Sequence, residues 1–267
     1  MTRVAVVGLG AMGSRIARRL ADRGHAVIGW NRTPREVGVP IAPTVRDAAA
    51  HAEIVITMLA DREALEAVSD DLLAGLQGTL VEMSTVGPAA IARLAERTTN
   101  LVDAPVLGSL AEVETGTLTI FAGGHVAPVR PVLEDLGTVL EVGPVGSGAA
   151  AKLVANAGLL GELAALGDVV ALGRALGVDE QLIFEGLATT PLAAPAERRR
   201  SVLQGEPSPP RFPARLAAKD ARLMLEHGDF GTIEAALRAL DAADDDADYT
   251  ALLNEPSRAA AARRSPS

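Results

Sequence analysis

Residues 4–13 have the sequence Val-Ala-Val-Val-Gly-Leu-Gly-Ala-Met-Gly, in which a short aliphatic run leads directly into three spaced glycines. A continuous apolar run is typical of a strand that is covered on both faces, and residues 13–23 then follow a helical spacing. Gly8 permits a tight turn, Gly10 lets the backbone approach a pyrophosphate, and Gly13 lets helix and strand pack closely. The segment therefore predicts a dinucleotide-binding turn, with these candidate contacts: Gly8, Leu9, Gly10, Ala11, Met12 and Gly13.

The same alternation of strand and helix continues over the first 140 residues. Helical spacing occurs at residues 62–74 and 88–98. Further strands are predicted at residues 26–30, 54–59, 80–83, 101–102 and 117–122. Because the strands are apolar on both faces, this pattern predicts an α/β fold with a Rossmann-type, doubly wound parallel sheet.

The second half of the chain has a different pattern, with no predicted strand. One long helix is expected from Ala149 to Leu176, with glycines that let another segment pack close, and shorter ones at 179–187, 192–203, 213–226 and 233–243. We therefore predict a dinucleotide-binding domain at residues 1–145 and an all-helical domain at 146–267, with Gly143–Gly148 as the hinge. The tail from Ser257 is expected to be frayed.

Composition excludes several classes of function. The chain of 267 residues has 25 basic and 34 acidic residues, a net charge of −9, and an acidic surface disfavours nucleic-acid binding. There is no cysteine, and the four histidines are scattered, so no metal site is expected. The first apolar run is too short for a signal peptide, and Pro144 and Lys152 interrupt the longest apolar stretch. We expect a soluble, cytoplasmic protein without a membrane span.

The end of the second predicted strand indicates which dinucleotide is bound. A site that prefers NAD carries Asp or Glu there to bind the ribose 2′-hydroxyl, whereas this chain has Asn31, Arg32 and Thr33. Arginine is a cationic donor suited to a 2′-phosphate, so NADP(H) is favoured. The alternative is that Arg32 is a solvated loop residue.

Two further strand ends are expected to face the same crevice, because ligands of such sheets lie outside the carboxyl ends of the strands. They carry Met58 and Leu59 on one strand and Ser84 and Thr85 on the next. The hydroxyl of Ser84 could bind a ligand or could cap the helix that begins near Pro88.

Lys152 is the only charged residue between Val142 and Gly161, and Asn156 projects from the same helix face one turn later. Such a lysine either extends to solvent or points into a polar cleft. Partial desolvation lowers a lysine pKa, which suits proton transfer near neutral pH. A second charged pair, Lys219 and Asp220, is either functional or a surface or intrahelical ion pair.

Taken together, these motifs resemble the β-hydroxyacid dehydrogenase family, which includes 3-hydroxyisobutyrate dehydrogenases. The resemblance spans nearly the whole chain, through the glycine turn, Asn31-Arg-Thr-Pro34, Met83-Ser-Thr-Val-Gly-Pro88, Asp103-Ala-Pro-Val106, Gly116-Thr-Leu-Thr119, Gly146-Ser-Gly-Ala-Ala-Ala-Lys152 and Leu216-Ala-Ala-Lys-Asp220. The resemblance implies that Lys152 is the acid/base, that Asn156 orients substrate, that Thr85 lies by the nicotinamide, and that Lys219 closes over the cofactor. It also implies a substrate and dimerisation role for the helical domain, in a homodimer or homotetramer.

Three departures from the family pattern matter, and the first two concern the substrate. The family's Ser-Gly-Gly, which binds the substrate carboxylate, is replaced by Leu107-Gly108-Ser109, and its Asn-Asn is replaced by Ala155-Asn156. Residues 36–44 are too short for the helix that usually follows the second strand. We expect NADP(H)-dependent interconversion of a small 3-hydroxy acid or alcohol and its semialdehyde or oxo form, with Ser84, Leu107, Gly108 and Ser109 near the substrate. The alternatives are imine reduction and a non-catalytic NADPH-binding module.

Overall fold

The computed structural model describes residues 1–204 and 212–253. The tail from Ser257, expected to be frayed, lies outside the described residues. The chain divides into two compact units, Met1–Val154 and Ala155–Ser267. This division falls inside one long helix, later in the chain than the predicted domain boundary at 145/146. The roles assigned to the two predicted domains stay predictions.

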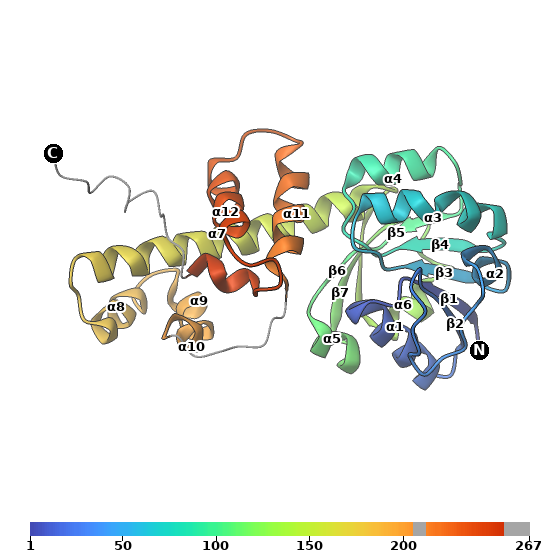
Figure 1. The fold of residues 1–267 in the computed structure, drawn as a ribbon, viewed down its shortest axis with the longest axis horizontal. Coiled ribbons are helices and arrows are strands. Elements are labelled where there is room, and N and C mark those ends of the chain that lie inside the picture. Colours follow the sequence, from blue (N-terminus) through green and yellow to red (C-terminus); the bar gives the residue numbers. More distant parts are fainter. Residues whose placement is uncertain (205–211, 254–267) are drawn as a thin grey trace. The chain divides into compact units, whose positions relative to one another are not determined.

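The first unit is built on one sheet, and the predicted α/β fold class is confirmed (Figure 1). The strands are paired in the order β2-β1-β3-β4-β5-β7-β6, with β8 beside β7. Their bounds are β1 Arg3–Val7, β2 Ala26–Trp30, β3 Ile54–Thr57, β4 Thr79–Glu82, β5 Leu101–Asp103, β6 Val106–Leu107, β7 Leu118–Gly124 and β8 Gly137–Gly143. Because β2 and β3 flank β1, the sheet reverses its direction of winding beside the glycine turn, where ligands of such sheets bind.

The expected parallel arrangement holds from β2 to β5 and then changes. Strand β7 is antiparallel to both β5 and β6, and β8 is parallel to β7. Strands β6 and β8 were not predicted from the sequence. The first has two residues, and most residues of β8 are exposed or half-buried, so neither has the apolar run of a central strand.

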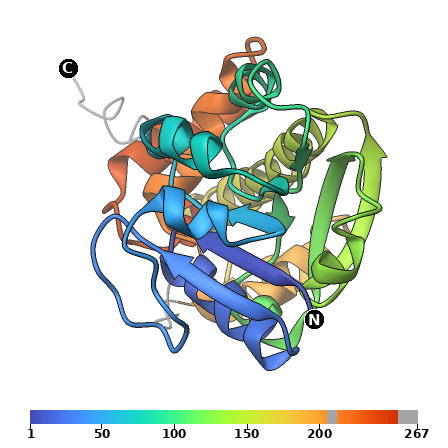
Figure 2. The same cartoon turned by 90° about the vertical axis from the view of Figure 1, so that its right-hand side faces the viewer.

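Helices cover both faces of this sheet, as Figures 1 and 2 show. Helices α1 Ala11–Asp22, α5 Leu110–Thr115 and α6 Arg130–Glu134 contribute to one aliphatic cluster. Helices α2 Val45–Ala50, α3 Arg62–Gly75 and α4 Pro88–Ala95 contribute to the other. The short helices α2, α5 and α6 were not predicted, because they have at most six residues and show little periodicity. The prediction that residues 36–44 form no helix is confirmed.

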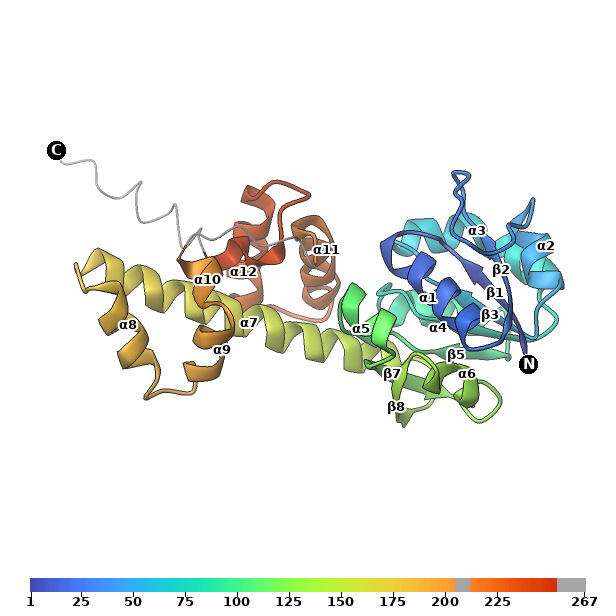
Figure 3. The same cartoon turned by 90° about the horizontal axis from the view of Figure 1, so that it is seen from below.

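Beyond Val154 the described residues form helices only, joined by one isolated bridge between Pro213 and Asp248. Helix α7 runs without interruption (Figure 3). The predicted helix 192–203 is divided in two at Arg199. The elements are α7 Ser147–Ala175, α8 Glu180–Leu187, α9 Ala193–Arg198, α10 Arg200–Leu203, α11 Ala214–Leu225, α12 Gly231–Ala242 and the short 3-10 helix η1 Tyr249–Leu253.

Glycines of α7 let other segments of the second unit approach it closely. A Cβ atom at Gly173 would lie 2.6 Å from Cδ1 of Ile183, and one at Gly167 would lie 2.7 Å from the carbonyl oxygen of Leu252. Among the described residues, α7 is also the one helix long and apolar enough to cross a bilayer. The core helix of a soluble protein meets the same criterion, so this property alone assigns no location.

Candidate functional site

The glycine turn after β1 is shaped by close backbone packing. Gly8 has φ +95°, and a Cβ there would lie 2.4 Å from the carbonyl oxygen of Met58. A Cβ at Gly13 would lie 1.9 Å from the carbonyl oxygen of Gly8, whereas one at Gly10 would meet nothing within 4 Å. The turn is therefore closed toward the sheet and open at Gly10. Helix α1 begins there without a side-chain cap, so its first N–H groups fit a pyrophosphate.

The end of β2 is tied to this turn by two side chains. Oδ1 of Asn31 accepts a hydrogen bond of 2.9 Å from the amide of Leu9, and Nη1 of Arg35 donates one of 2.9 Å to the Leu9 carbonyl. The side chain of Asn31 also donates to the carbonyl of Thr33. Arg32 is exposed and makes no hydrogen bond or ion pair within the described residues, so its guanidinium is available. Sequence reasoning missed Arg35, although it is the second arginine of Asn31-Arg-Thr-Pro-Arg35.

A buried carboxylate connects the ends of β3 and β4. The Thr57 hydroxyl donates to Oε2 of Glu82, and Oε1 of Glu82 accepts a hydrogen bond of 2.6 Å from the Ser84 amide. The Ser84 hydroxyl in turn accepts one of 2.8 Å from the Leu59 amide. This series of hydrogen bonds fixes the two strand ends that carry Met58, Leu59, Ser84 and Thr85.

One alternative about this region is wrong, and one residue of the region was not predicted. Helix α4 has Gly87 as its N-cap residue, so the alternative that Ser84 caps this helix is wrong. The Ser84 hydroxyl is instead used between two strand ends. The residue that was not predicted is Glu82, which is fully buried. The signal was present: Glu82 is a lone charged residue in the apolar run of a central strand, and such a residue needs buried partners.

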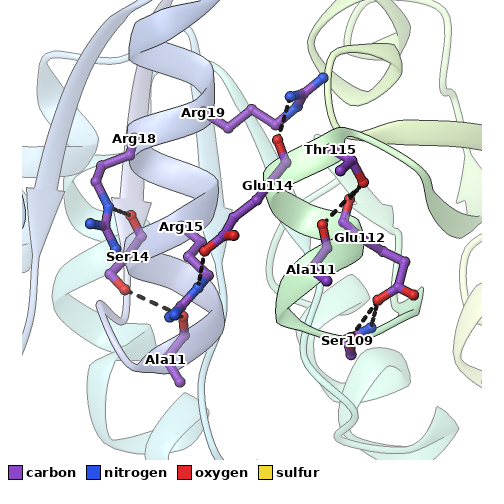
Figure 4. A network of polar contacts seen from close by, with 10 residues as sticks. All are labelled: Ala11, Ser14, Arg15, Arg18, Arg19, Ser109, Ala111, Glu112, Glu114 and Thr115. Atoms are coloured by element: carbon purple, nitrogen blue, oxygen red, sulfur yellow. Dashed lines mark hydrogen bonds and ion pairs between the residues drawn. The ribbon is translucent and has the colours of Figure 1, made fainter. Parts of the chain in front are cut away.

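The segment Leu107-Gly108-Ser109 connects β6 to α5. Ser109 caps α5: its amide donates to Oε2 of Glu112 at 2.8 Å, and its hydroxyl also donates to this carboxylate (Figure 4). Gly108 has φ +141°, where a side chain would be strained. The Ser109 hydroxyl is thus committed to the first turn of α5, while Leu107 is half-buried.

Helix α5 lies beside α1, and arginines of α1 join the two (Figure 4). Nε of Arg15 lies 2.7 Å from Oε1 of Glu114, and Nη1 of Arg19 donates to the Glu114 carbonyl at 2.8 Å. The helix that begins at the glycine turn is therefore linked to the helix that begins at Ser109.

The two predicted catalytic residues, Lys152 and Asn156, are both buried, and each belongs to a different compact unit. Lys152 is 8% exposed in the first unit, so the alternative that it extends into solvent is not supported. Asn156 is 1% exposed in the second unit, and its Nδ2 donates a hydrogen bond of 2.6 Å to Oδ2 of Asp220. Lys219 Nζ lies 2.7 Å from Oδ1 of the same carboxylate. The ion pair is intrahelical, as one alternative allowed, but Asp220 is buried and also holds Asn156.

Comparison with known proteins points to one family. Residues 3–146 match the family model of the NAD binding domain of 6-phosphogluconate dehydrogenase. The chain is 35% identical to a 3-hydroxyisobutyrate dehydrogenase of Pseudomonas aeruginosa over 62% of its own length and 61% of that protein. It is 32% identical to a probable 3-hydroxyisobutyrate dehydrogenase of Mycobacterium bovis, over 69% and 68% of the two chains. The alignment thus spans less than two thirds of the Pseudomonas protein.

A solved structure shares the whole fold. The Mycobacterium tuberculosis 3-hydroxyisobutyrate dehydrogenase, solved with L-serine, superposes with a TM-score of 0.82 at 24% identity. The superposition covers 95% of this chain and 98% of the other. Both the sheet and the helical part are therefore shared with that enzyme.

The contact between Ser84 and Leu59 gives a first prediction. Replacing Ser84 by alanine removes the acceptor of the partly buried Leu59 amide. A buried unsatisfied donor costs about 1–3 kcal/mol of unfolding free energy, so we expect a loss near the lower end of that range. Chemical denaturation measures this loss. Ser69→Ala is the matched control, since the buried Ser69 hydroxyl donates to a helix carbonyl, that of Leu65. We expect a smaller loss for the control, and an equal loss in the two variants would contradict the assigned role.

Proposed function

The chain belongs to the β-hydroxyacid dehydrogenase family, and from this premise we propose that it is an NADP(H)-dependent oxidoreductase of small hydroxy or oxo compounds. Its dinucleotide-binding part would be residues 1–145, and residues 146–267 would serve the substrate and the assembly of subunits. The proposed reaction interconverts a 3-hydroxy acid or alcohol and its semialdehyde or oxo form, in the cytoplasm. The observation that carries the proposal is the buried Lys152, one helical turn before the buried Asn156.

The residues of this chain fit the cofactor at several points. The open backbone at Gly10 and the uncapped start of α1 suit a pyrophosphate. The available guanidinium of Arg32 suits a 2′-phosphate, and Asn31 provides no carboxylate for a 2′-hydroxyl. Met58, Leu59 and Thr85 would line the cofactor. As the family resemblance implies, Lys219 of α11 would close over it. When bound, the nicotinamide supplies or accepts the hydride.

Lys152 would act as the acid/base on the substrate oxygen. Carbonyl reduction places negative charge on that oxygen, and an ammonium at hydrogen-bond distance stabilises the charge and then donates a proton. In the reverse direction the neutral amine accepts the hydroxyl proton. Asn156, whose amide is oriented by Asp220, would hold the substrate beside the lysine.

The substrate end departs from the family pattern. The Ser109 hydroxyl is committed to Glu112, and Leu107 adds an apolar side chain. Ser84, Leu107, Gly108 and Ser109 would therefore form a less polar substrate seat than the family's Ser-Gly-Gly.

Leu107 and Ala155 also favour the second candidate function, which is reduction of an imine. An iminium substrate already carries positive charge and gains less from Lys152, so the lysine favours a carbonyl. The lysine also counts against a non-catalytic NADPH-binding module.

Cofactor preference is the second prediction. Arg32→Ala should weaken NADPH binding by about 1–3 kcal/mol, the range for losing a charge-assisted hydrogen bond, with little change for NADH. Dissociation constants for both cofactors, measured by fluorescence or calorimetry, provide the test. Arg97→Ala, which removes an exposed arginine paired with Asp70, is the control and should change neither constant. Equal or tighter binding of NADH by the wild-type protein would refute the NADP(H) preference.

The third prediction concerns Lys152. General acid catalysis contributes about 10²–10⁴-fold, so Lys152→Ala should lower kcat by that factor and leave NADPH affinity nearly unchanged. Lys152→Arg should restore little activity, because a guanidinium does not readily give up its proton. A panel of small aldehydes, 2-oxo acids and imines, followed by NADPH absorbance, identifies the best substrate first. If Lys152→Ala keeps more than half of the wild-type turnover, Lys152 is not the proton donor.

The fourth prediction is a homodimer or homotetramer formed through the helical part. Large apolar side chains stay exposed along the end of α7 and beyond it: Val169, Leu172, Leu176, Val178 and Leu182. Burial of these side chains between subunits would favour association. Sedimentation should give a mass of two or four times 27.4 kDa, and Leu172→Glu should shift it toward the monomer. Val142→Glu, at an exposed site on β8, is the control, and a wild-type monomer at micromolar concentration would exclude the proposal.

A further inference from the structure

Asp103 is a buried carboxylate outside the predicted site residues. It ends β5 and is fully buried. Its Oδ1 accepts a hydrogen bond of 2.8 Å from the Gly146 amide, and its Oδ2 accepts one of 2.8 Å from the Ala149 amide. Burial raises the pKa of Asp103, whereas the hydrogen bonds from Ala149 and Gly146 act in the opposite direction.

These two amides belong to the start of α7. The first N–H groups of a helix have no partner within it, and a negative charge is favoured at that end. Where a side chain caps the start of a helix, it is typically that of the N-cap residue, just before the helix. Here it comes from a strand of the sheet, so the cap also anchors α7 to the C-terminal end of β5.

The start of α7 is packed too closely against the sheet to leave space for a side chain at Gly148 or Gly123. A Cβ at Gly148 would lie 2.3 Å from the Phe121 carbonyl oxygen and 2.5 Å from that of Asp103. A Cβ at Gly123 would lie 2.5 Å from Oδ1 of Asp103. Helix α7 therefore meets β5 and β7 backbone to backbone, with the carboxylate clasped between two glycines.

Lys152 follows this anchor by one helical turn. It comes three residues after Ala149 and four after Gly148, a rise of about 4.5–6 Å along the axis. Lys152 also lies in the same compact unit as the sheet, whereas Asn156 lies in the other. The position of the lysine relative to the strand ends is thus set by the first turn of α7.

We propose that Asp103 is a positioning residue for catalysis, whose carboxylate fixes the first turn of α7 and thereby holds Lys152 in place against the dinucleotide-binding sheet. This role rests on the proposed function of Lys152. A purely structural cap would affect stability alone. A positioning residue affects turnover while cofactor binding is retained, because the glycine turn and the ends of β2 and β3 lie outside the anchor.

The variant that tests this is Asp103→Asn. Asparagine keeps the shape and one acceptor but presents an N–H₂ group to one of the two amides, so one of the two hydrogen bonds is lost. Asp103→Ala removes both and should have a larger effect in the same direction. Asp179→Asn is the matched control, because Asp179 caps α8 by accepting from the Gln181 amide and asparagine is an equally good cap.

The readout uses a property of the chain: Lys152 and Lys219 are its only lysines. In the full-length protein grown with lysine labelled with ¹³C at Cε, two side-chain signals are expected, and Lys219→Arg assigns them. In Asp103→Asn the Lys152 signal should move and the Lys219 signal should not. A misplacement of about 1 Å can cost 10²-fold, so kcat should fall by about tenfold or more, with the NADPH dissociation constant unchanged. Asp179→Asn should leave both signals, kcat and NADPH affinity as in the wild type.

Three outcomes would overturn the positioning role. They are an unmoved Lys152 signal in both Asp103 variants, an unchanged kcat in the folded Asp103→Asn protein, and a loss of NADPH affinity as large as the loss of kcat. Lys152→Ala, measured in parallel, separates this failure from failure of the proposed function. If Lys152→Ala keeps its turnover, the catalytic role of Lys152 is wrong, and the positioning role falls with it even when the lysine signal moves.

Discussion

Backbone-to-backbone contact at glycine is the constraint on which the rest of the first unit depends. Gly13 packs against the carbonyl of Gly8, Gly8 against that of Met58, and Gly148 against those of Phe121 and Asp103. The first two contacts seat α1 on the sheet, and the third seats α7. Both helix starts carry proposed chemistry: the first would bind a pyrophosphate, and the second leads to Lys152. A methyl group at any of these glycines would separate a helix from the sheet that orients it.

Three buried carboxylates add hydrogen bonds to the arrangement that the close glycine contacts set. Glu82 joins the ends of β3 and β4, Asp103 clasps the start of α7, and Asp220 holds Asn156. A buried charge is costly unless hydrogen bonds satisfy it, so each is stable only where its donors are in place. Each therefore selects one arrangement of its neighbours.

The sequence predicted much of the fold because the glycine turn and the two-sided apolar strands act locally. The α/β class, the long helix and the absence of a helix at residues 36–44 follow from local pattern. The antiparallel direction of β7 could not be predicted, because strand direction depends on contacts with other segments and not on the local pattern. Strand β8 could not be predicted either, because most of its residues are exposed or half-buried and it has no apolar run. Glu82 and Asp103 were not singled out from the sequence for a related reason, and Asp220 was singled out only as half of a charged pair with Lys219. The hydrogen-bond partners that define these carboxylates, such as Thr57 for Glu82, Gly146 for Asp103 and Asn156 for Asp220, are distant in sequence. The Ser109 hydroxyl donates to Glu112, and the assignment of Ser109 to the substrate stays a prediction.

Lysine and arginine are used at different kinds of position in this protein. Of 25 lysines and arginines, only Lys152 and Lys219 are lysines, and both lie among the predicted site residues. Arginines form most of the exposed ion pairs, such as those of Arg93 with Glu66 and Arg97 with Asp70, where a permanent charge is sufficient. A guanidinium keeps its proton, whereas an amine can give one up and regain it. If Lys152 served only as a buried cation, arginine would provide the same charge. The lysine is required if the group at this position must exchange a proton with the substrate oxygen.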